Sequence, residues 1–290
     1  MTDKGPLAGM KVIELAHIMA GPVCGLMLAD MGADVIKVEK PDGDDSRRFV
    51  PPAIEGESAA YMMMNRNKRG VALNLKDPDA VEALHRLLKD ADVVIENYRM
   101  GTMERLGLGY EDLRAINPRL IYCEISGFGR TGPYAERGGF DLIAQGMSGL
   151  MSITGEGPGR PPVKTGAPVS DITAGIVAAM GVSAAYARML QTGEGQKVDT
   201  SLFEAAITQT YWQSAIAFAT SVAPGPMGSA HPLNGPYQAF ETADGYLNLA
   251  CLNDRLFERF CAAIDRPNLA TDERFQTNAD RVEHMDELEA

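Results

Sequence analysis

Short apolar runs alternate with helical patterns through the first half of the chain. Alternating or unbroken apolar runs predict strands, and apolar residues three or four positions apart predict helices. Strands are expected over 11–15, 33–39, 71–75, 92–96 and 120–125. Helices are expected over 21–31 and over 77–90, which begins with an Asp-Pro pair. This order predicts an α/β fold with an open, mostly parallel sheet that has helices on both faces.

The second half of the chain is expected to contain longer helices and one hairpin. Small residues fill a helix over 171–191, which ends at a Gly-Glu-Gly sequence. A Gly- and Pro-rich loop over 224–236 is a candidate domain boundary. Beyond it, the pair Asp244-Gly245 predicts a hairpin turn. Further helices are expected over 199–219, 253–264 and 280–290.

Composition and charge exclude several classes of protein. The net charge of −12 argues against a general nucleic-acid surface, although a local basic pocket for a phosphorylated small molecule remains compatible with it. Gly, Arg or Gln interrupts the longest apolar stretches short of the roughly 18 residues that a membrane span needs. Residues 1–8 resemble neither a signal peptide nor a transit peptide. We therefore expect a cytoplasmic protein without a membrane or nucleic-acid partner.

The four cysteines, Cys24, Cys123, Cys251 and Cys261, are far apart and form no CxxC pair. This spacing is typical of reduced core thiols in an intracellular protein and predicts neither a disulfide framework nor a metal site.

One stretch matches the GxGxxG pattern of dinucleotide-binding loops. Gly127 to Gly132 follows an expected strand, as such a loop should. However, Pro133 comes next and no helix opens there. The pattern also belongs in the first strand–helix turn, where the chain has His17 to Pro22 instead. Nicotinamide or flavin binding is therefore disfavoured.

Basic residues gather near the ends of the expected strands. In an acidic chain, such residues can bind phosphates through charge-assisted hydrogen bonds, although each of them could equally be a solvated surface residue. The cluster consists of Lys37, Lys40, the segment 65–69, Lys76, Arg99 and Arg105.

Asp171 begins the helix of small residues. An acid at this position is commonly a helix cap or a partner of the helix dipole. The alternative is a carboxylate nucleophile that is held near helix-end N–H groups. His17 could act as a base or only pack in its loop, and Asp141 could equally cap a loop.

Several blocks of sequence occur in the order found in one known family. The chain resembles the class III coenzyme A transferases, the CaiB/BaiF group, and in its second half the succinyl-CoA-dependent members most. The blocks are 9–15, 20–22, 32–39, 65–69, 96–97 with Gly101, 126–133, 171–175, 192–196 and 236–240.

The resemblance implies a Rossmann-like large domain over 1–223 that binds CoA and carries the active site. It also implies a smaller α+β domain over 224–290 and an interlocked homodimer. Asp171 would attack the acyl-CoA thioester to give an anhydride and then an aspartyl-CoA thioester, from which an acceptor acid takes the CoA. At neutral pH an unperturbed aspartate is already ionised and needs no general base. Acyl-CoA and a small carboxylic acid would be the substrates, and no tightly bound cofactor is expected.

The resemblance also implies a set of CoA contacts. The basic members would meet the phosphates, Leu73 would pack near the adenine, and the 224–236 loop would cover the acyl site and exclude water. By motif position the contacts are His17, Lys40, Leu73, Lys76, Asn97, Tyr98, Arg99 and Arg105.

Two departures from the family pattern leave alternatives open. Family members usually run about a hundred residues longer, so the second domain is expected to be truncated, and the chain could be an inactive CoA-binding protein. An α-methylacyl-CoA racemase is the other alternative, but its Gly-His-Asp motif reads Gly139-Phe140-Asp141 here, and Phe140 cannot accept a proton. Met19 stands where formyl-CoA:oxalate enzymes carry Gln, which disfavours oxalate.

Overall fold

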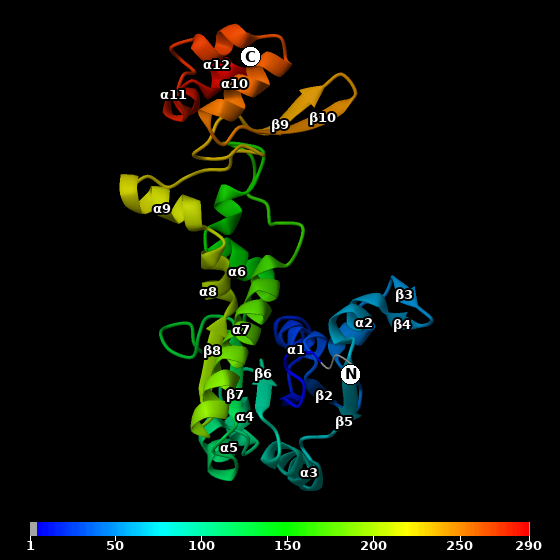
Figure 1. The fold of residues 1–290 in the computed structure, drawn as a ribbon. Helices are drawn as coiled ribbons and strands as arrows, with labels where there is room; N and C mark the ends of the chain where they lie inside the picture. Colours follow the sequence, from blue (N-terminus) through cyan, green and yellow to red (C-terminus); the bar gives the residue numbers. More distant parts are fainter. Residues whose placement is uncertain (1–4, 290) are drawn as a thin grey trace. The chain divides into compact units, whose positions relative to one another are not determined.

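A six-stranded parallel sheet organises most of the structure, a computed structural model that describes residues 5–289 (Figure 1). The strand order is β5-β2-β1-β6-β7-β8. The order reverses between β1 and β6, and open α/β sheets bind ligands at the carboxyl ends of strands beside such a switch point. The strands are β1 (Lys11–Glu14), β2 (Asp34–Glu39), β5 (Lys68–Ala72), β6 (Val93–Glu96), β7 (Ile121–Ser126) and β8 (Lys197–Ser201).

Helices cover both faces of the sheet, which confirms the predicted fold class. One face packs against α1 (Ala20–Asp30), α7 (Val169–Thr192) and α8 (Leu202–Thr208). The other packs against α3 (Pro78–Lys89), α4 (Thr102–Arg105) and α5 (Tyr110–Ile116). Every residue of β6 and β7 is buried, and therefore these strands read as nearly unbroken apolar runs in the sequence.

The predicted helix over 199–219 is wrong. Its region contains β8, α8 and a separate helix, α9 (Tyr211–Thr220). β8 pairs with β7 alone and is therefore an edge strand, with polar Lys, Asp, Thr and Ser at four of its five positions. An edge strand buries less apolar surface than a central strand, so its hydrophobic signal is weak. For the same reason β5, the other edge, lies three residues earlier than predicted.

α7 packs closely against α1, and its small residues make this approach possible (Figure 1). A Cβ atom at Gly175 would lie 2.7 Å from the Ala20 carbonyl oxygen and from the Val23 side chain. The helix ends at Gly193, whose left-handed backbone (φ 76°) donates its N–H to Met189 O at 2.8 Å. This is the common glycine C-cap.

By length and composition, α7 is apolar enough to cross a membrane. Its buried residues pack against α1, α8, β7 and β8 in the core of the sheet domain. Core helices commonly meet the same two criteria, and packing accounts for the part of the apolar window that is buried, which is 39%.

Contacts between Cα atoms divide the chain into two compact units. The first extends to Ser148 and resumes over Thr165–Gln209, and the second comprises Gly149–Lys164 and the chain from Thr210 onward. The second unit thus begins before the predicted boundary at 223/224 and includes an inserted segment. The assignment of domains with separate roles stays a prediction.

The second unit contains the predicted hairpin, formed by β9 (Tyr237–Thr242) and β10 (Gly245–Ala250). Its core includes Phe257 and Phe275 around a fully buried Arg281. The Arg281 guanidinium is satisfied by three backbone carbonyls and by Asp254 at 2.8 Å, which explains how a charge is tolerated there. The helices of this unit include α9, α10 (Asp254–Ala263), α11 (Asn278–Glu283) and α12 (Met285–Glu289).

The remaining elements belong to the first unit or are single turns. They are β3 (Ala53–Ile54), β4 (Glu57–Ser58), α2 (Ala59–Asn65), α6 (Asp141–Met147) and the 3₁₀ turns Asp45–Arg48, Leu150–Ile153 and Pro267–Thr271.

We predict that Gly175→Ala destabilises the protein, because the added methyl group would overlap α1 backbone and side-chain atoms. Overpacking of this kind should lower the free energy of unfolding by about 1–3 kcal/mol. Urea denaturation measures the change. Leu190→Ala, at an exposed position on the same helix, is the matched control and should change the stability little. Equal stability of wild type and Gly175→Ala would contradict the prediction.

Candidate active site

Two neighbouring cavities lie at the carboxyl ends of the central strands, beside the switch point of the sheet. The first, of about 430 Å³, is lined by segments that follow β1, β2 and β5 and by α4. The second, of about 420 Å³, is lined by segments that follow β1, β6 and β7 and by the first turn of α7. His17, Tyr98 and Thr102 line both cavities. These volumes are typical of small-molecule sites.

The structure brings all nine predicted site residues to these two cavities. Asp171 lines the second cavity, and the predicted CoA contacts are divided between the two. The first cavity contains His17, Lys40, Leu73, Lys76, Tyr98 and Arg105. The second contains His17, Asn97, Tyr98, Arg99 and Asp171. Their contacts with a ligand remain predictions.

The boundary between the cavities is formed by residues that follow β1 and β6. The backbone N–H of His17 donates to Asn97 Oδ1 at 3.0 Å, and Asn97 Nδ2 donates to the carbonyl oxygen of His17 at 2.9 Å. The rings of His17 and Tyr98 meet edge to face, 5.4 Å apart. Burial lowers the pKa of His17, which favours a neutral imidazole at this boundary.

The carboxylate of Asp171 has no hydrogen-bond or ion-pair partner among the described residues, and it does not cap its own helix. Burial, followed by the negative charge of Asp141, raises its pKa to about 7. The expectation of an unperturbed aspartate is therefore wrong, because burial disfavours the charged form of this carboxyl group. The cap interpretation is also wrong for the side chain as it lies here.

Asp141 takes the capping role instead, from a different segment of the chain. Its Oδ1 accepts the backbone N–H of Ser170 at 2.9 Å in the first turn of α7, and its Oδ2 accepts from Gln145 at 2.7 Å. Asp141 thus satisfies an unpaired N–H of α7 while Asp171 remains available to the cavity.

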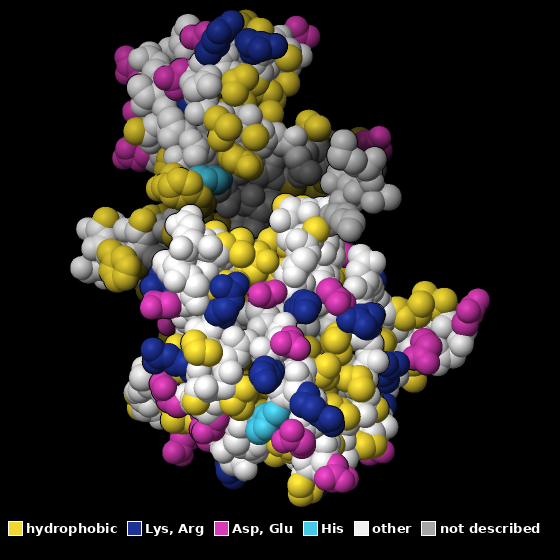
Figure 2. Space-filling model, turned by 60° about the horizontal axis from the view of Figure 1, so that its bottom comes forward, with side chains coloured by type: hydrophobic (Ala, Val, Ile, Leu, Met, Phe, Trp, Pro, Cys, Tyr) yellow, Lys and Arg dark blue, Asp and Glu magenta, His cyan; other side chains and the backbone are white. Residues whose placement is uncertain are grey.

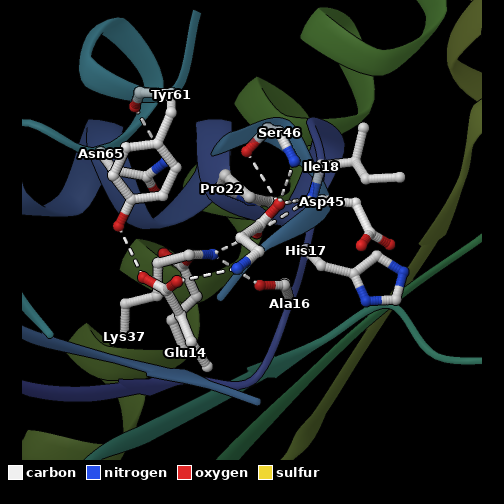
Figure 3. Close-up of polar contacts among 12 residues, drawn as sticks. Glu14, Ala16, His17, Ile18, Pro22, Lys37, Asp45, Ser46, Tyr61 and Asn65 are labelled. Carbon is white, nitrogen blue, oxygen red and sulfur yellow. Dashed lines mark hydrogen bonds and ion pairs between the residues drawn. The ribbon is translucent and has the colours of Figure 1, made fainter. Parts of the chain in front are cut away.

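Lys37 does not belong to the phosphate-binding set that the basic cluster suggested. Its ammonium group is buried and lies 3.0 Å from Glu14 Oε1, 2.9 Å from Asp44 Oδ2 and 2.8 Å from the carbonyl oxygen of Ala16 (Figure 3). Although burial lowers it, the two carboxylates raise the pKa of Lys37 above its ordinary value. Lys37 is therefore a charged structural residue beneath the first cavity.

The segment 65–69 is also structural. Lys68 is buried and lies 2.8 Å from Glu14 Oε2, and it donates to the Pro22 carbonyl oxygen at 2.8 Å. Arg66 and Arg69 pair with acidic residues on the surface. On the face of the molecule shown in Figure 2, basic and acidic side chains are interspersed rather than separated by sign. The basic residues that line the cavities are Lys40, Lys76, Arg99, Arg105, Arg130 and Arg137. Of these, Lys40 pairs with Asp45 at 2.6 Å, and Arg130 pairs with Glu96 and Glu124.

The GxGxxG segment is a loop that anchors neighbouring segments and does not have the form of a dinucleotide-binding turn. Gly127 lies against the Gly139 backbone, where a Cβ atom would be 2.6 Å from Gly139 Cα. Arg130 extends from this loop to Glu96 Oε1 at 3.1 Å, to the Tyr98 carbonyl oxygen at 2.9 Å and to Glu124. Burial, and then the neighbouring Glu124, raises the pKa of Glu96 to about 8. The segment thus fixes the backbone of Tyr98 and shows no helix N-terminus for a pyrophosphate.

Sequence reasoning missed Asp44, Thr102, Arg130 and Arg137 as residues at or beneath the cavities. The segments of Asp44 and Arg137 carry no pattern that distinguishes them from ordinary loops, whereas Arg130 lies within the GxGxxG segment, which could have indicated it. Among residues 5–289, no group of three or more His, Cys, Asp or Glu side chains is arranged to hold a metal ion.

Comparison with known proteins gives a family match over nearly the whole chain. The model of CoA-transferase family III matches residues 7–290. The chain belongs to CoA-transferase family III. This finding confirms the family resemblance and the predicted enzyme class.

Named relatives and a solved structure cover nearly the whole chain. A succinate–glutarate CoA-transferase of Agrobacterium fabrum is 46% identical over 99% of this chain and 74% of its own length. The human succinyl-CoA:glutarate CoA-transferase is 38% identical over 99% of this chain and 66% of its own length. The crystal structure of a CaiB/BaiF family protein from Brucella suis has a TM-score of 0.86 and 44% identity, and the match covers 98% of this chain and 76% of that chain.

We predict that Asp171→Asn stabilises the family III chain more at pH 8 than at pH 5. Because the pKa of Asp171 is raised to about 7, the stability that its neutral form contributes is complete only below the ordinary pKa of about 4, and it is lost progressively as the pH rises to about 7. An amide carries no charge at either pH. Thermal unfolding at the two pH values measures the difference. Asp79→Asn, an exposed acid in the first turn of α3, is the control. A gain of the same size at both pH values would contradict the raised pKa.

Proposed function

We propose that this chain transfers coenzyme A from an acyl-CoA donor to a carboxylic acid acceptor, with Asp171 as the nucleophile. The observation that carries the proposal is the unpaired Asp171 carboxylate in the wall of a cavity that adjoins a second, partly basic cavity. Family membership supplies the class of reaction, and the two cavities supply separate places for a thioester and for the nucleotide that it carries.

The first step forms an anhydride. An Asp171 oxygen attacks the thioester carbonyl carbon, the C–S bond breaks, and CoA leaves as the thiolate. The thiolate then attacks the Asp171 carbonyl carbon, which releases the first acid as a carboxylate and leaves an aspartyl-CoA thioester. Splitting the exchange in this way replaces one difficult step by easier ones.

The acceptor acid completes the cycle by the reverse sequence. Its carboxylate attacks the Asp171 carbonyl carbon and displaces the CoA thiolate, which gives a second anhydride. The thiolate then attacks the acceptor's carbonyl carbon, forms the new acyl-CoA and releases Asp171 as a carboxylate. The raised pKa of Asp171 makes its ionised form more basic, and hence more nucleophilic, than an exposed aspartate.

The first cavity suits the nucleotide part of CoA. Lys40, Lys76 and Arg105 supply positive charge, and Leu73 supplies an apolar surface for an adenine. The pantetheine arm would then pass His17 and Tyr98, which line both cavities, and place the thioester near Asp171. The neutral state favoured for His17 avoids a fixed positive charge beside this uncharged arm.

A dicarboxylate such as succinate or glutarate is the proposed acid pair. The named relatives in Agrobacterium fabrum and in humans are CoA-transferases of these two acids. Arg99 and Arg137 line the second cavity and could balance the charge of a dicarboxylate.

We also infer a cytoplasmic location and a homodimer. Four buried free cysteines support the first, and exposed apolar side chains such as Met180 and Ile176 on α7 support the second.

A racemase is not supported by the second cavity. Phe140 lines it at the position where such enzymes carry a histidine, and a phenyl ring cannot take up the α-proton of an acyl-CoA.

We predict that Asp171→Ala abolishes CoA transfer and leaves CoA binding intact, because the carboxylate is the nucleophile but does not line the first cavity. Wild-type protein incubated with succinyl-CoA and then hydroxylamine should yield a hydroxamate at Asp171, detectable by peptide mass spectrometry. Asp79→Ala removes a first-turn acid from α3 instead and should keep full activity. Turnover by Asp171→Ala at the wild-type rate, or trapping at another residue, would refute the nucleophile assignment.

We predict that dicarboxylates are better acceptors than monocarboxylates of the same chain length. Succinate and glutarate are compared with butyrate and valerate as acceptors from succinyl-CoA, and the new thioesters are measured by mass spectrometry. Oxalate should be a poor acceptor, since Met19, which lines the second cavity, offers no amide to hold it. Equal rates for both classes of acid would show that the second carboxylate is not recognised.

A further inference from the structure

The turn at which the two cavities meet contains a strained residue. Ile18 has a φ of 63°, in the left-handed region that β-branched residues rarely occupy. It lies between His17, which lines both cavities, and the first turn of α1, which begins at Ala20. Backbone strain of this kind persists only where the surrounding structure imposes it, and it is found most often at functional sites.

The Asp44 carboxylate holds the Ile18 backbone in this left-handed conformation. The Ile18 N–H donates to both carboxylate oxygens of Asp44 at 3.3 Å. Asp44 is itself held by the Ser46 N–H at 2.9 Å, by the Ser46 hydroxyl at 2.7 Å and by Lys37 at 2.9 Å. Its side chain is 1% exposed, so these contacts replace water completely.

The charge of Asp44 belongs to a buried series of alternating charges. Lys37 pairs with both Asp44 and Glu14, and Glu14 pairs with both Lys37 and Lys68. Figure 3 shows Lys37 beside Glu14. Although burial raises it, Lys37 and the Ser46 N–H lower the pKa of Asp44 to about 2, which keeps it ionised. A permanently ionised acceptor binds a backbone N–H more strongly than a neutral one does.

We propose that Asp44 is a positioning residue for acyl-CoA: by accepting the Ile18 N–H it holds the strained turn at which the two cavities meet. The proposal rests on the proposed function for the identity of the ligand. On the opposite side, Asn97 holds the neighbouring His17 through two hydrogen bonds. The turn is thus fixed from two strands, and its shape is set before the ligand arrives. Such preorganisation lowers the cost of binding.

The test is a double-mutant cycle. Asp44→Asn turns one of the two accepting oxygens into a donor that faces Lys37 or the Ile18 N–H. The KM for succinyl-CoA should rise about tenfold, which corresponds to about 1.4 kcal/mol of binding free energy, while kcat changes little. In the Ile18→Gly background the turn carries no strain to hold, so the same Asp44→Asn change should raise KM much less.

A purely structural role for Asp44 gives a different result. Asp44→Asn would then lower the unfolding temperature without changing KM, or would change KM equally in both backgrounds, and either result would overturn the proposal. Asp30→Asn breaks a surface pair with Arg66 in the same unit and serves as the control, with KM expected to stay unchanged.

A second comparison decides the matter if Asp44→Asn does not fold. Ile18→Gly and Ile18→Ala both remove the side chain, but only the alanine keeps the strain. The glycine variant adopts the turn without strain, so it should unfold at a higher temperature than the alanine variant and bind acyl-CoA at least as tightly. Weaker binding by the glycine variant than by the alanine variant would overturn the proposal.

Binding is measured separately from transfer. Calorimetric titration of CoA into Asp171→Ala protein, with and without Asp44→Asn, needs no chemical step. If the wild type forms no aspartyl adduct, the proposed function fails, but a weaker affinity after Asp44→Asn still supports the positioning role. If Asp171→Ala protein with Asp44 intact binds no CoA, both proposals are overturned.

Discussion

The buried series Asp44–Lys37–Glu14–Lys68 determines where the ends of three strands lie, and the candidate site depends on those ends. Glu14 ends β1, Lys37 lies in β2 and Lys68 begins β5. Each charge is costly to remove from water, and each is offset only because its partners lie within about 3 Å. A shift of any strand along its neighbour would leave a buried charge unpaired. The network therefore penalises alternative registers and supports the turn at His17 and Ile18 from below.

Asp171 differs from the residues of this series, because its carboxylate is not paired with any side chain that the structure describes. Its carboxylate is largely buried but has no partner among the described residues, and the nearby Asp141 raises the cost of its charge. In a structure that pairs other buried charges closely, this exception is the feature on which the proposed function rests. The free energy that a paired carboxylate would contribute to folding is absent here, and carboxylates with such perturbed pKa values are found more often at functional sites than elsewhere.

Much of the fold could be predicted because the central strands are buried on both faces. β6 and β7 consist largely of apolar residues, and their positions differ from the predicted ones by one residue. The edge strands could not be placed as well, because β5 and β8 are half-exposed and polar. The prediction that the whole basic cluster binds phosphates was too broad for a related reason. Whether a lysine such as Lys37 meets a phosphate or a buried glutamate depends on side chains that are distant in sequence.

The sequence by itself determined the α/β class, the family and the position of Asp171, because these depend on local periodicity and on ordered blocks of residues. Only the tertiary structure decided that Asp171 is unpaired with a raised pKa, that Arg130 holds the Tyr98 segment, and that Asp44 fixes a strained Ile18. The physical reason is that pKa values, ion pairs and backbone strain depend on distances between segments that lie far apart along the chain, and those distances exist only once the sheet has formed.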